Sequence, residues 1–181
     1  HFVAARLDGL FEVVAGCFST QKTINENSAQ RYGVSARRCY GSASEMLSAE
    51  VGPLDAVCVH THTLNHRAGV ISALVAGFNV ICEKALGTSV SEAEDISAAI
   101  SKPGQQLFVT FNYAGYPMVR EARAKIRNGS IGTVQQVYCE MPSDGFARIE
   151  TNPQDWRRQD YEIPCVSLDL GVHVHHIVDY L

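Results

Sequence analysis

Several sequence patterns are absent from this 181-residue chain, and each absence excludes a class of protein. No apolar run reaches the roughly 18 residues that a membrane-spanning helix needs, and no secretory signal opens the sequence. The fifteen Lys and Arg residues are scattered among nineteen Asp and Glu residues, so the chain shows no basic footprint for nucleic acid. We therefore expect a cytoplasmic protein that binds neither nucleic acid nor a membrane.

Closely spaced cysteines are absent as well. The six cysteines never form Cys-x-x-Cys, and several fall inside predicted strands. This pattern indicates buried free thiols in a reducing compartment rather than a disulfide framework.

None of the fourteen glycines forms Gly-x-Gly-x-x-Gly, the turn that cradles phosphate in dinucleotide-binding folds. The chain begins at His1, without methionine, inside one apolar periodic stretch and stops at Leu181 inside another. We expect an internal fragment of a longer protein that is inactive by itself. In such a fragment, helices predicted at 115–127 and 168–181 would expose apolar faces.

What the chain does contain is a repeated alternation of strand and helix patterns. Residues 55–60 and 78–82 are apolar runs of strand length, and residues 64–77 between them carry apolar side chains at helical spacing. Apolar runs without polar alternation are typical of strands covered on both faces. A helix that joins two such strands forms the βαβ unit of a parallel sheet.

The same alternation extends on both sides of this unit. Strands are predicted at 11–18 and 107–111, and a helix from about residue 24 ends at Tyr32, with Gly33 in the left-handed position that follows. Ser42-Ala-Ser-Glu45 and Ser89-Val-Ser-Glu92 are capping boxes that announce two more helices. The pattern predicts an α/β fold with a doubly wound parallel sheet.

The pattern changes at Asn112, where we expect a second domain over 112–181 after a first domain over 1–111. A helix is predicted at about 115–127, a strand at 133–140 and, after an irregular stretch to Pro164, a helix over 168–181. The last helix would carry Asp169, His173 and His176 along one face.

Ligands of parallel sheets bind beyond the carboxyl ends of the strands. Thr61, Thr63 and His66 follow the strand at 55–60, and the adjacent acid and base Glu83 and Lys84 end the next strand. This edge of the sheet is therefore the candidate site.

Three motifs together resemble the Gfo/Idh/MocA oxidoreductases. They are Glu83-Lys84 at one strand end, Asn112-Tyr113 at the next, and Asp169-Leu-Gly-Val-His173 at the start of a helix. The resemblance covers essentially the whole chain and implies a Rossmann-type domain that lacks its first strand and Gly-rich turn. It also implies the truncated start of a second α/β domain with an open sheet, and a homo-oligomer in the full-length protein.

By this resemblance, the complete protein would use NAD or NADP to move a hydride to or from a sugar, polyol or related hydroxyl substrate. His173 would take the hydroxyl proton, Lys84 would stabilise the developing alkoxide, and Asp169 would orient the imidazole and favour its protonated form. We expect these three groups to converge at one pocket between the domains.

The remaining expected contacts fall into two groups. The cofactor-binding residues are Ser19, Thr20, Thr61, Thr63, His66, Glu83, Lys84 and Asn112; the substrate-binding residues are Tyr113, Trp156, Arg157 and His176. Ser19 and Thr20 stand where an acid usually recognises the adenine ribose of NAD, so the choice between NAD and NADP stays open.

Two other functions remain open. His60-Thr-His62 and His173-Val-His175-His176 invite a metal-dependent hydrolase, although no carboxylate lies at ligand spacing nearby and we expect no metal. A dinucleotide-binding regulator without catalysis is the other, because one fold can host several functions.

Overall fold

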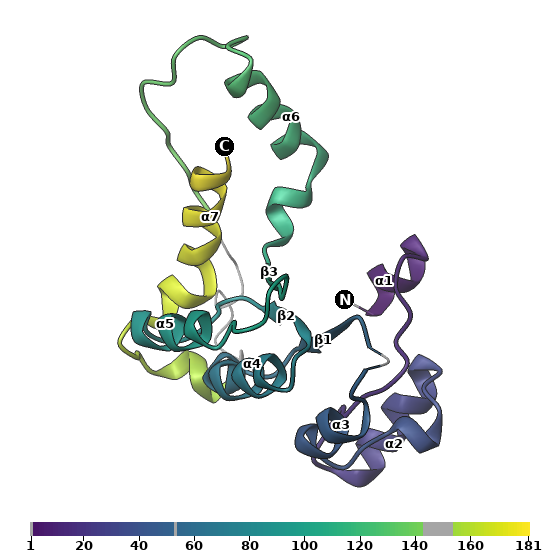
Figure 1. Cartoon of the computed structure of the whole chain (residues 1–181). Helices are drawn as coiled ribbons and strands as arrows, with labels where there is room; N and C mark the ends of the chain where they lie inside the picture. The colour runs from purple at the N-terminus through teal and green to yellow at the C-terminus, as the bar shows by residue number, and fades with distance from the viewer. Residues whose placement is uncertain (1, 53, 143–153) are drawn as a thin grey trace.

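The computed structural model describes residues 2–52, 54–142 and 154–181. Its centre is a parallel sheet of three strands in the order β1 (Ala56–Val59), β2 (Asn79–Glu83) and β3 (Leu107–Thr110). The register pairs Val57 with Val80, and Val80 with Leu107. The predicted α/β class with a parallel sheet is confirmed (Figure 1).

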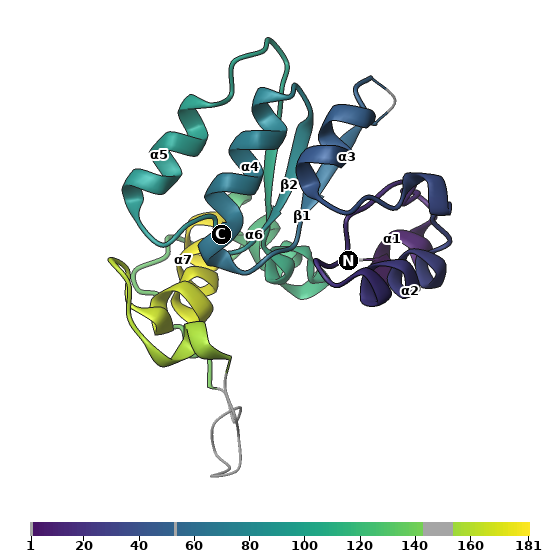
Figure 2. The same ribbon diagram turned by 90° about the horizontal axis from the view of Figure 1, so that it is seen from below.

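Three helices, α3 (Ala43–Ala49), α4 (His66–Val75) and α5 (Val90–Ala98), lie along one side of the sheet (Figure 2). They cover it because their apolar side chains and those of one strand face form a single core. Fully buried members of this core include Val70, Leu74, Val80 and Ile96.

The second face of the sheet is open in the described part of the chain, contrary to the expectation of strands covered on both faces. Cys58, Ile81 and Phe108 form one row across the three strands on this face. Cys58 is exposed and Phe108 is 54% exposed. The apolar runs specify strands that can be covered, but they do not specify what covers them.

The predicted helix ends are confirmed at three places. Ser42 Oγ accepts a hydrogen bond from the Glu45 amide at 3.1 Å, and Ser89 Oγ accepts one from the Glu92 amide at 3.1 Å. Gly33 follows α2 (Lys22–Tyr32) with φ of 75°, a left-handed conformation that glycine adopts without strain.

The expected strand at 11–18 is wrong. Within it the structure shows an isolated parallel bridge, between Gly16 and Cys39, after helix α1 (Phe2–Asp8). A strand requires a continuous hydrogen-bonded partner, and the short helix η1 (Ala36–Arg38) ends just before Cys39. The amide of Asn25 joins this region by bonding the Phe18 amide and the Tyr40 carbonyl.

The part after Asn112 is mainly helical. It contains η3 (Asn112–Gly115), α6 (Pro117–Arg127), η4 (Asp155–Arg158), the π-helical turn η5 (Ser167–Gly171) and α7 (Val172–Tyr180). A further short helix, η2 (Thr63–Asn65), precedes α4. Residues 133–140 do not form the expected strand, because no described segment pairs with them.

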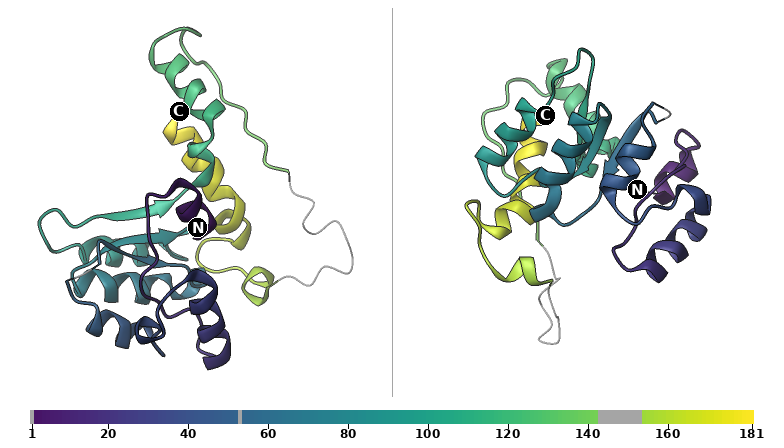
Figure 3. Two further views of the ribbon diagram at one scale, coloured as in Figure 1. Left: turned by 90° about the vertical axis from the view of Figure 1, so that its right-hand side faces the viewer. Right: turned by 60° about the horizontal axis from the view of Figure 1, so that its bottom comes forward.

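Helix α7 lies beyond the carboxyl ends of the strands, at the edge where ligands of parallel sheets bind (Figure 3). The six cysteines are free, as expected, but the expectation that they are buried holds only for Cys82 and Cys165, since Cys58 and Cys139 are exposed. None of the described helices has the length and apolar character that crossing a membrane requires.

Candidate active site

The end of β2 delivers two charged side chains to the carboxyl edge of the sheet. Glu83 Oε1 accepts a hydrogen bond from Thr110 Oγ1 of β3 at 2.7 Å, which fixes the acid against the neighbouring strand. Lys84 Nζ donates to Asp169 Oδ1 at 2.9 Å and to the backbone carbonyl of Asp169 at 2.6 Å. The Lys84 and Asp169 side chains are 19% and 20% exposed, so the ion pair remains accessible to solvent.

Asp169 accepts from a second cation. Arg157 Nε lies 2.8 Å from Asp169 Oδ2, and an Nη atom of Arg157 lies 3.3 Å from Oδ1. Burial works to raise the pKa of the Asp169 carboxyl, but the hydrogen bonds from Arg157 and Lys84 outweigh it and hold the pKa below its ordinary value. Asp169 is therefore a carboxylate held between two cations.

His173 lies in the first turn of α7 and is 8% exposed. Its ring meets the ring of Tyr113 edge-on, with centroids 4.8 Å apart. Burial, and then the positive charge of Lys84, lower the pKa of His173, while Asp169 works in the opposite direction. Asp169 does favour the protonated imidazole, as expected, but burial and Lys84 outweigh this effect and hold the pKa of His173 below its ordinary value.

The described contacts include no hydrogen bond between Asp169 and His173, although we expected Asp169 to orient the imidazole. The Asp169 carboxylate instead bonds Lys84 and Arg157, and the buried Nδ1 of His173 has no hydrogen-bond partner in the described residues. The π-helical turn before α7 changes the phase between the two residues, which a regular helical spacing did not anticipate.

Aromatic rings surround the imidazoles of α7. Phe111, at the end of β3, stacks on His176 with centroids 4.0 Å apart. Sequence reasoning missed Phe111, although its position immediately before Asn112 could have indicated it. Of the expected substrate-binding residues, Tyr113 therefore contacts the ring of His173, and His176 lies one turn further along α7.

His66 is 1% exposed, and both of its ring nitrogens face backbone carbonyls. Nδ1 lies 2.7 Å from the Ala85 oxygen, and Nε2 lies 2.9 Å from the Thr61 oxygen. The ring thus joins the loop after β1 to the residue after Lys84, which favours a structural role over direct contact with a cofactor.

The other expected cofactor residues are distributed along the strand ends. Thr63 is 7% exposed and Thr61 is exposed, while Asn112 opens η3 after β3. Ser19 and Thr20 lie apart from Lys84, where they line a cavity of about 650 Å³ together with Lys22.

The 154–158 segment brings the last two expected substrate residues together. Trp156 Nε1 donates to Gln154 Oε1 at 2.7 Å, and the guanidinium of Arg157 lies 4.8 Å from the centre of the Trp156 ring. Arg157 thus reaches Asp169 while one face of its guanidinium is covered by an aromatic ring.

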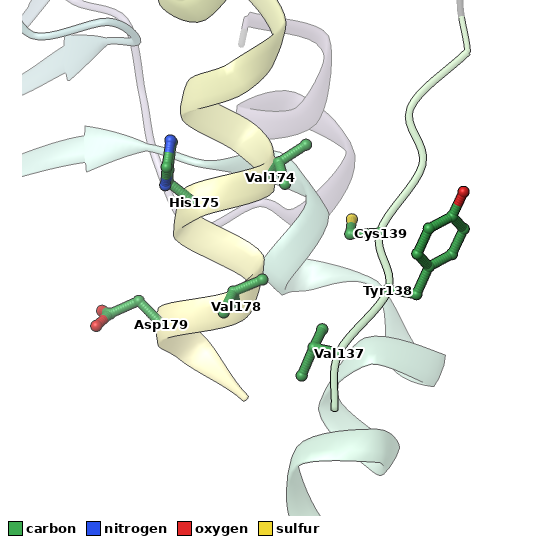
Figure 4. Close-up of a pocket in the computed structure, with 7 residues that line it drawn as sticks. All are labelled: Val137, Tyr138, Cys139, Val174, His175, Val178 and Asp179. Carbon is green, nitrogen blue, oxygen red and sulfur yellow. The ribbon is translucent and has the colours of Figure 1, made fainter. Parts of the chain in front are cut away.

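A second cavity, of about 670 Å³, lies between α7 and residues 137–139 (Figure 4). It is lined on α7 by Val174, His175, Val178 and Asp179. These residues occupy the face of α7 opposite to His173 and His176. Neither of the two cavities includes Lys84, Asp169 or His173, so the expected shared pocket is not among them.

The histidine pairs do not form a metal centre in the described part of the chain. No group of three or more His, Cys, Asp or Glu side chains among these residues could hold a metal ion. The metal-dependent hydrolase therefore has no ligand set in residues 2–52, 54–142 and 154–181.

An ammonium, a carboxylate and an imidazole lie beyond the strand ends of a parallel sheet, which is where Rossmann-type domains bind their ligands. The profile of the oxidoreductase family with an NAD-binding Rossmann fold, Gfo/Idh/MocA, matches residues 3–111. The chain belongs to this family, as its motifs led us to expect.

Individual proteins extend the similarity beyond residue 111. An uncharacterised oxidoreductase, YfiI, from Bacillus subtilis is 31% identical over 98% of this chain and 48% of its own length. Levoglucosan dehydrogenase from Pseudarthrobacter phenanthrenivorans is 28% identical over 100% of this chain and 47% of its own length. The chain thus spans about half the length of these curated relatives.

The fold is also similar to solved structures. An inositol dehydrogenase homologue from Azotobacter vinelandii, in complex with NADH and myo-inositol, superposes with a TM-score of 0.63 at 33% identity. The match covers 67% of this chain and 33% of that protein.

Proposed function

We propose that the complete protein is an NAD(P)-dependent dehydrogenase that transfers a hydride between the nicotinamide and a carbon bearing a hydroxyl group in a sugar or polyol. The observation that carries the proposal is the ion pair of Lys84 with Asp169 beyond the strand ends. The charges of both groups act on the buried imidazole of His173, whose pKa is lowered by burial and then by Lys84. The relatives named for levoglucosan and inositol support the substrate class.

We propose further that residues 1–111 form the cofactor domain and that residues 112–181 begin the substrate domain. The sheet lies in the first segment, and the second contributes Asp169 and His173 to its edge. Lys84, the third proposed catalytic residue, directly follows β2, which ends at Glu83.

The residues at this edge fit a nicotinamide cofactor. The site offers a partly exposed ammonium, the hydroxyl of Thr61 at the end of β1, and a buried ring nitrogen of His173 without a partner among the described residues. When bound, the cofactor supplies hydride transfer, and the protein supplies orientation and proton transfer.

The proposed roles follow from charge and protonation. Oxidation of an alcohol removes a hydride from carbon and a proton from oxygen, and neutral His173 is in the form that can accept this proton. An ammonium has three donors, and Asp169 takes two of those on Lys84. The third donor can bind the substrate oxygen and stabilise its developing negative charge.

The test uses the complete protein with NAD or NADP and a panel of polyols and sugars, with formation of the reduced nicotinamide as the readout. Lys84→Met and His173→Ala should each lower kcat by about 10²–10⁴-fold while the cofactor Kd stays close to that of the parent. Lys102→Met, at an exposed lysine in the α5–β3 loop, should leave both values unchanged.

The alternative function, a regulator that binds a dinucleotide without catalysis, predicts a different outcome. In that case no substrate in the panel is turned over, and the Lys84 and His173 variants change only the cofactor Kd. Such a result would overturn the proposed dehydrogenase.

A further inference from the structure

Arg157 was expected to contact substrate, but its contacts in the structure point elsewhere. Its Nε and one Nη reach the two carboxylate oxygens of Asp169, at 2.8 and 3.3 Å. The Trp156 ring lies 4.8 Å from the guanidinium carbon. Much of the hydrogen-bonding capacity of Arg157 is therefore already used within the protein.

We propose that Arg157 is a positioning residue that acts through Asp169, holding the carboxylate so that Oδ1 and the backbone carbonyl together fix the Lys84 ammonium. The inference rests on the proposed function for its catalytic consequence, since the Lys84 ammonium is the group assigned to the substrate oxygen. Its structural part concerns only the chain from Arg157 to Asp169 to Lys84.

Arg157 contacts both carboxylate oxygens of Asp169, and one of them also binds Lys84. Arg157 Nε bonds Oδ2 at 2.8 Å and an Nη atom reaches Oδ1 at 3.3 Å, while the same Oδ1 accepts from Lys84 Nζ at 2.9 Å. A carboxylate with one cation can rotate about its side-chain bonds, whereas a carboxylate clamped by a planar guanidinium has one preferred orientation. Lysine would supply a charge here but not this fork.

Charge supports the same conclusion. Asp169 is 20% exposed at its side chain, and burial alone disfavours its ionised form. Besides Lys84, whose ammonium already bonds Asp169, the titratable groups close to it include His173 in α7 and the buried thiol of Cys165, whose pKa is raised first by burial and then by the charge of Asp169. Neither is a cation that could replace Arg157.

The first experiment follows the carboxyl carbon of Asp169 by NMR across acid pH in the complete protein without cofactor, with Asp169→Asn used to assign the signal. In Arg157→Gln the titration of Asp169 should move to higher pH, because a hydrogen-bonded cation is lost. Arg157→Lys should restore part of the shift. Arg158→Gln should have no effect, because Arg158 is 52% exposed and pairs with exposed Asp155.

The second experiment separates positioning from substrate binding. A positioning role predicts that Arg157→Gln lowers kcat by about 10–100-fold with little change in the substrate KM, and that Arg157→Lys recovers part of the loss. A higher KM with unchanged kcat would assign Arg157 to the substrate and overturn the inference.

The two proposals fail in distinguishable ways. If the parent protein turns over no substrate but the Asp169 titration still moves in Arg157→Gln, the dehydrogenase fails while the structural link from Arg157 to Asp169 stands. If the Asp169 titration is the same in the parent and in Arg157→Gln, the positioning role is overturned whatever the turnover.

Discussion

His173 has surroundings that suit a group accepting a proton near neutral pH. Burial and the nearby Lys84 ammonium disfavour the imidazolium and lower the pKa of His173. The ring therefore stays neutral to a lower pH than an ordinary histidine does. The ring of Tyr113 packs edge-on against the ring of His173, with centroids 4.8 Å apart.

The pKa of His173 should rise when Lys84 loses its charge. NMR titration of the ring should place the His173 midpoint of Lys84→Met above that of the parent, with Lys102→Met as the matched control. An unchanged midpoint in Lys84→Met would show that the two groups do not interact in solution.

The lowered pKa also sets the sign of a pH effect on stability. Because the folded state binds the proton of His173 less readily than the unfolded chain, this contribution to stability is present above about pH 6.5, the ordinary histidine value. It is lost as the pH falls through the lower pKa of the folded protein.

The site residues differ in how far the sequence could predict them. Lys84, Asp169 and His173 belong to motifs, so the sequence indicated them before any geometry was available. The bond from Arg157 to Asp169 joins residues twelve positions apart through an irregular segment and a π-helical turn. Neither segment has a fixed side-chain direction that periodicity can predict.

At the level of elements, local signals were sufficient for the βαβ units and insufficient for isolated strands. The unit over 55–84 and the helix caps at Ser42 and Ser89 depend on residues close in sequence, and the structure confirms them. The strands expected at 11–18 and 133–140 depend on a partner strand elsewhere in the chain. Their apolar patterns carry no information about that partner.

Glu50 joins the end of α3 to Arg38 and Tyr40, and we expect the stability of the fold at acid pH to depend on it. It caps the end of α3, is 4% exposed, and accepts hydrogen bonds from Arg38 and Tyr40. The hydrogen bonds from Arg38 and then Tyr40 lower the pKa of Glu50 to about 2.

The pKa of Glu50 is lower in the folded protein than in the unfolded chain. Glu50 therefore stabilises the fold at pH values above the ordinary pKa of glutamate, and this stabilisation is lost as the pH falls toward about 2. Thermal unfolding of Glu50→Gln should show a lower midpoint at neutral pH and a weaker dependence on acid pH than the parent. Glu121→Gln is the control, because Glu121 is 55% exposed in its pair with Lys125. Parallel acid curves for Glu50→Gln and the parent would contradict the prediction.

At the level of the whole molecule, the two faces of the sheet are unequal. One face is covered by α3, α4 and α5, and the other exposes Cys58 and Phe108 on either side of half-buried Ile81 in the described residues. An exposed apolar row of this kind marks a surface that other protein segments can cover.

The difference in exposure between the two faces of the sheet can be measured by the reactivity of the cysteine thiols. In the 181-residue chain, exposed Cys58 should react with a thiol reagent in the folded state, as followed by mass spectrometry of the labelled peptides. It should react more slowly than exposed Cys139, because burial raises the pKa of the Cys58 thiol and the thiolate is the reactive form. Cys82 should react only on unfolding, because it is fully buried and burial, then Glu83, raises the pKa of its thiol to about 12. Protection of Cys58 would mean that the open face is covered in solution.

The ion pair between Lys84 and Asp169 joins positions 85 residues apart in the chain. Closing a loop of this length costs chain entropy, so the contact depends on the packing of α7 against the sheet as well as on the pairing of the strands. A half-folded species with its three strands already paired would have a lysine in water and no assembled centre. The lysine and the carboxylate are therefore brought together only where the α7 region lies against the strand ends.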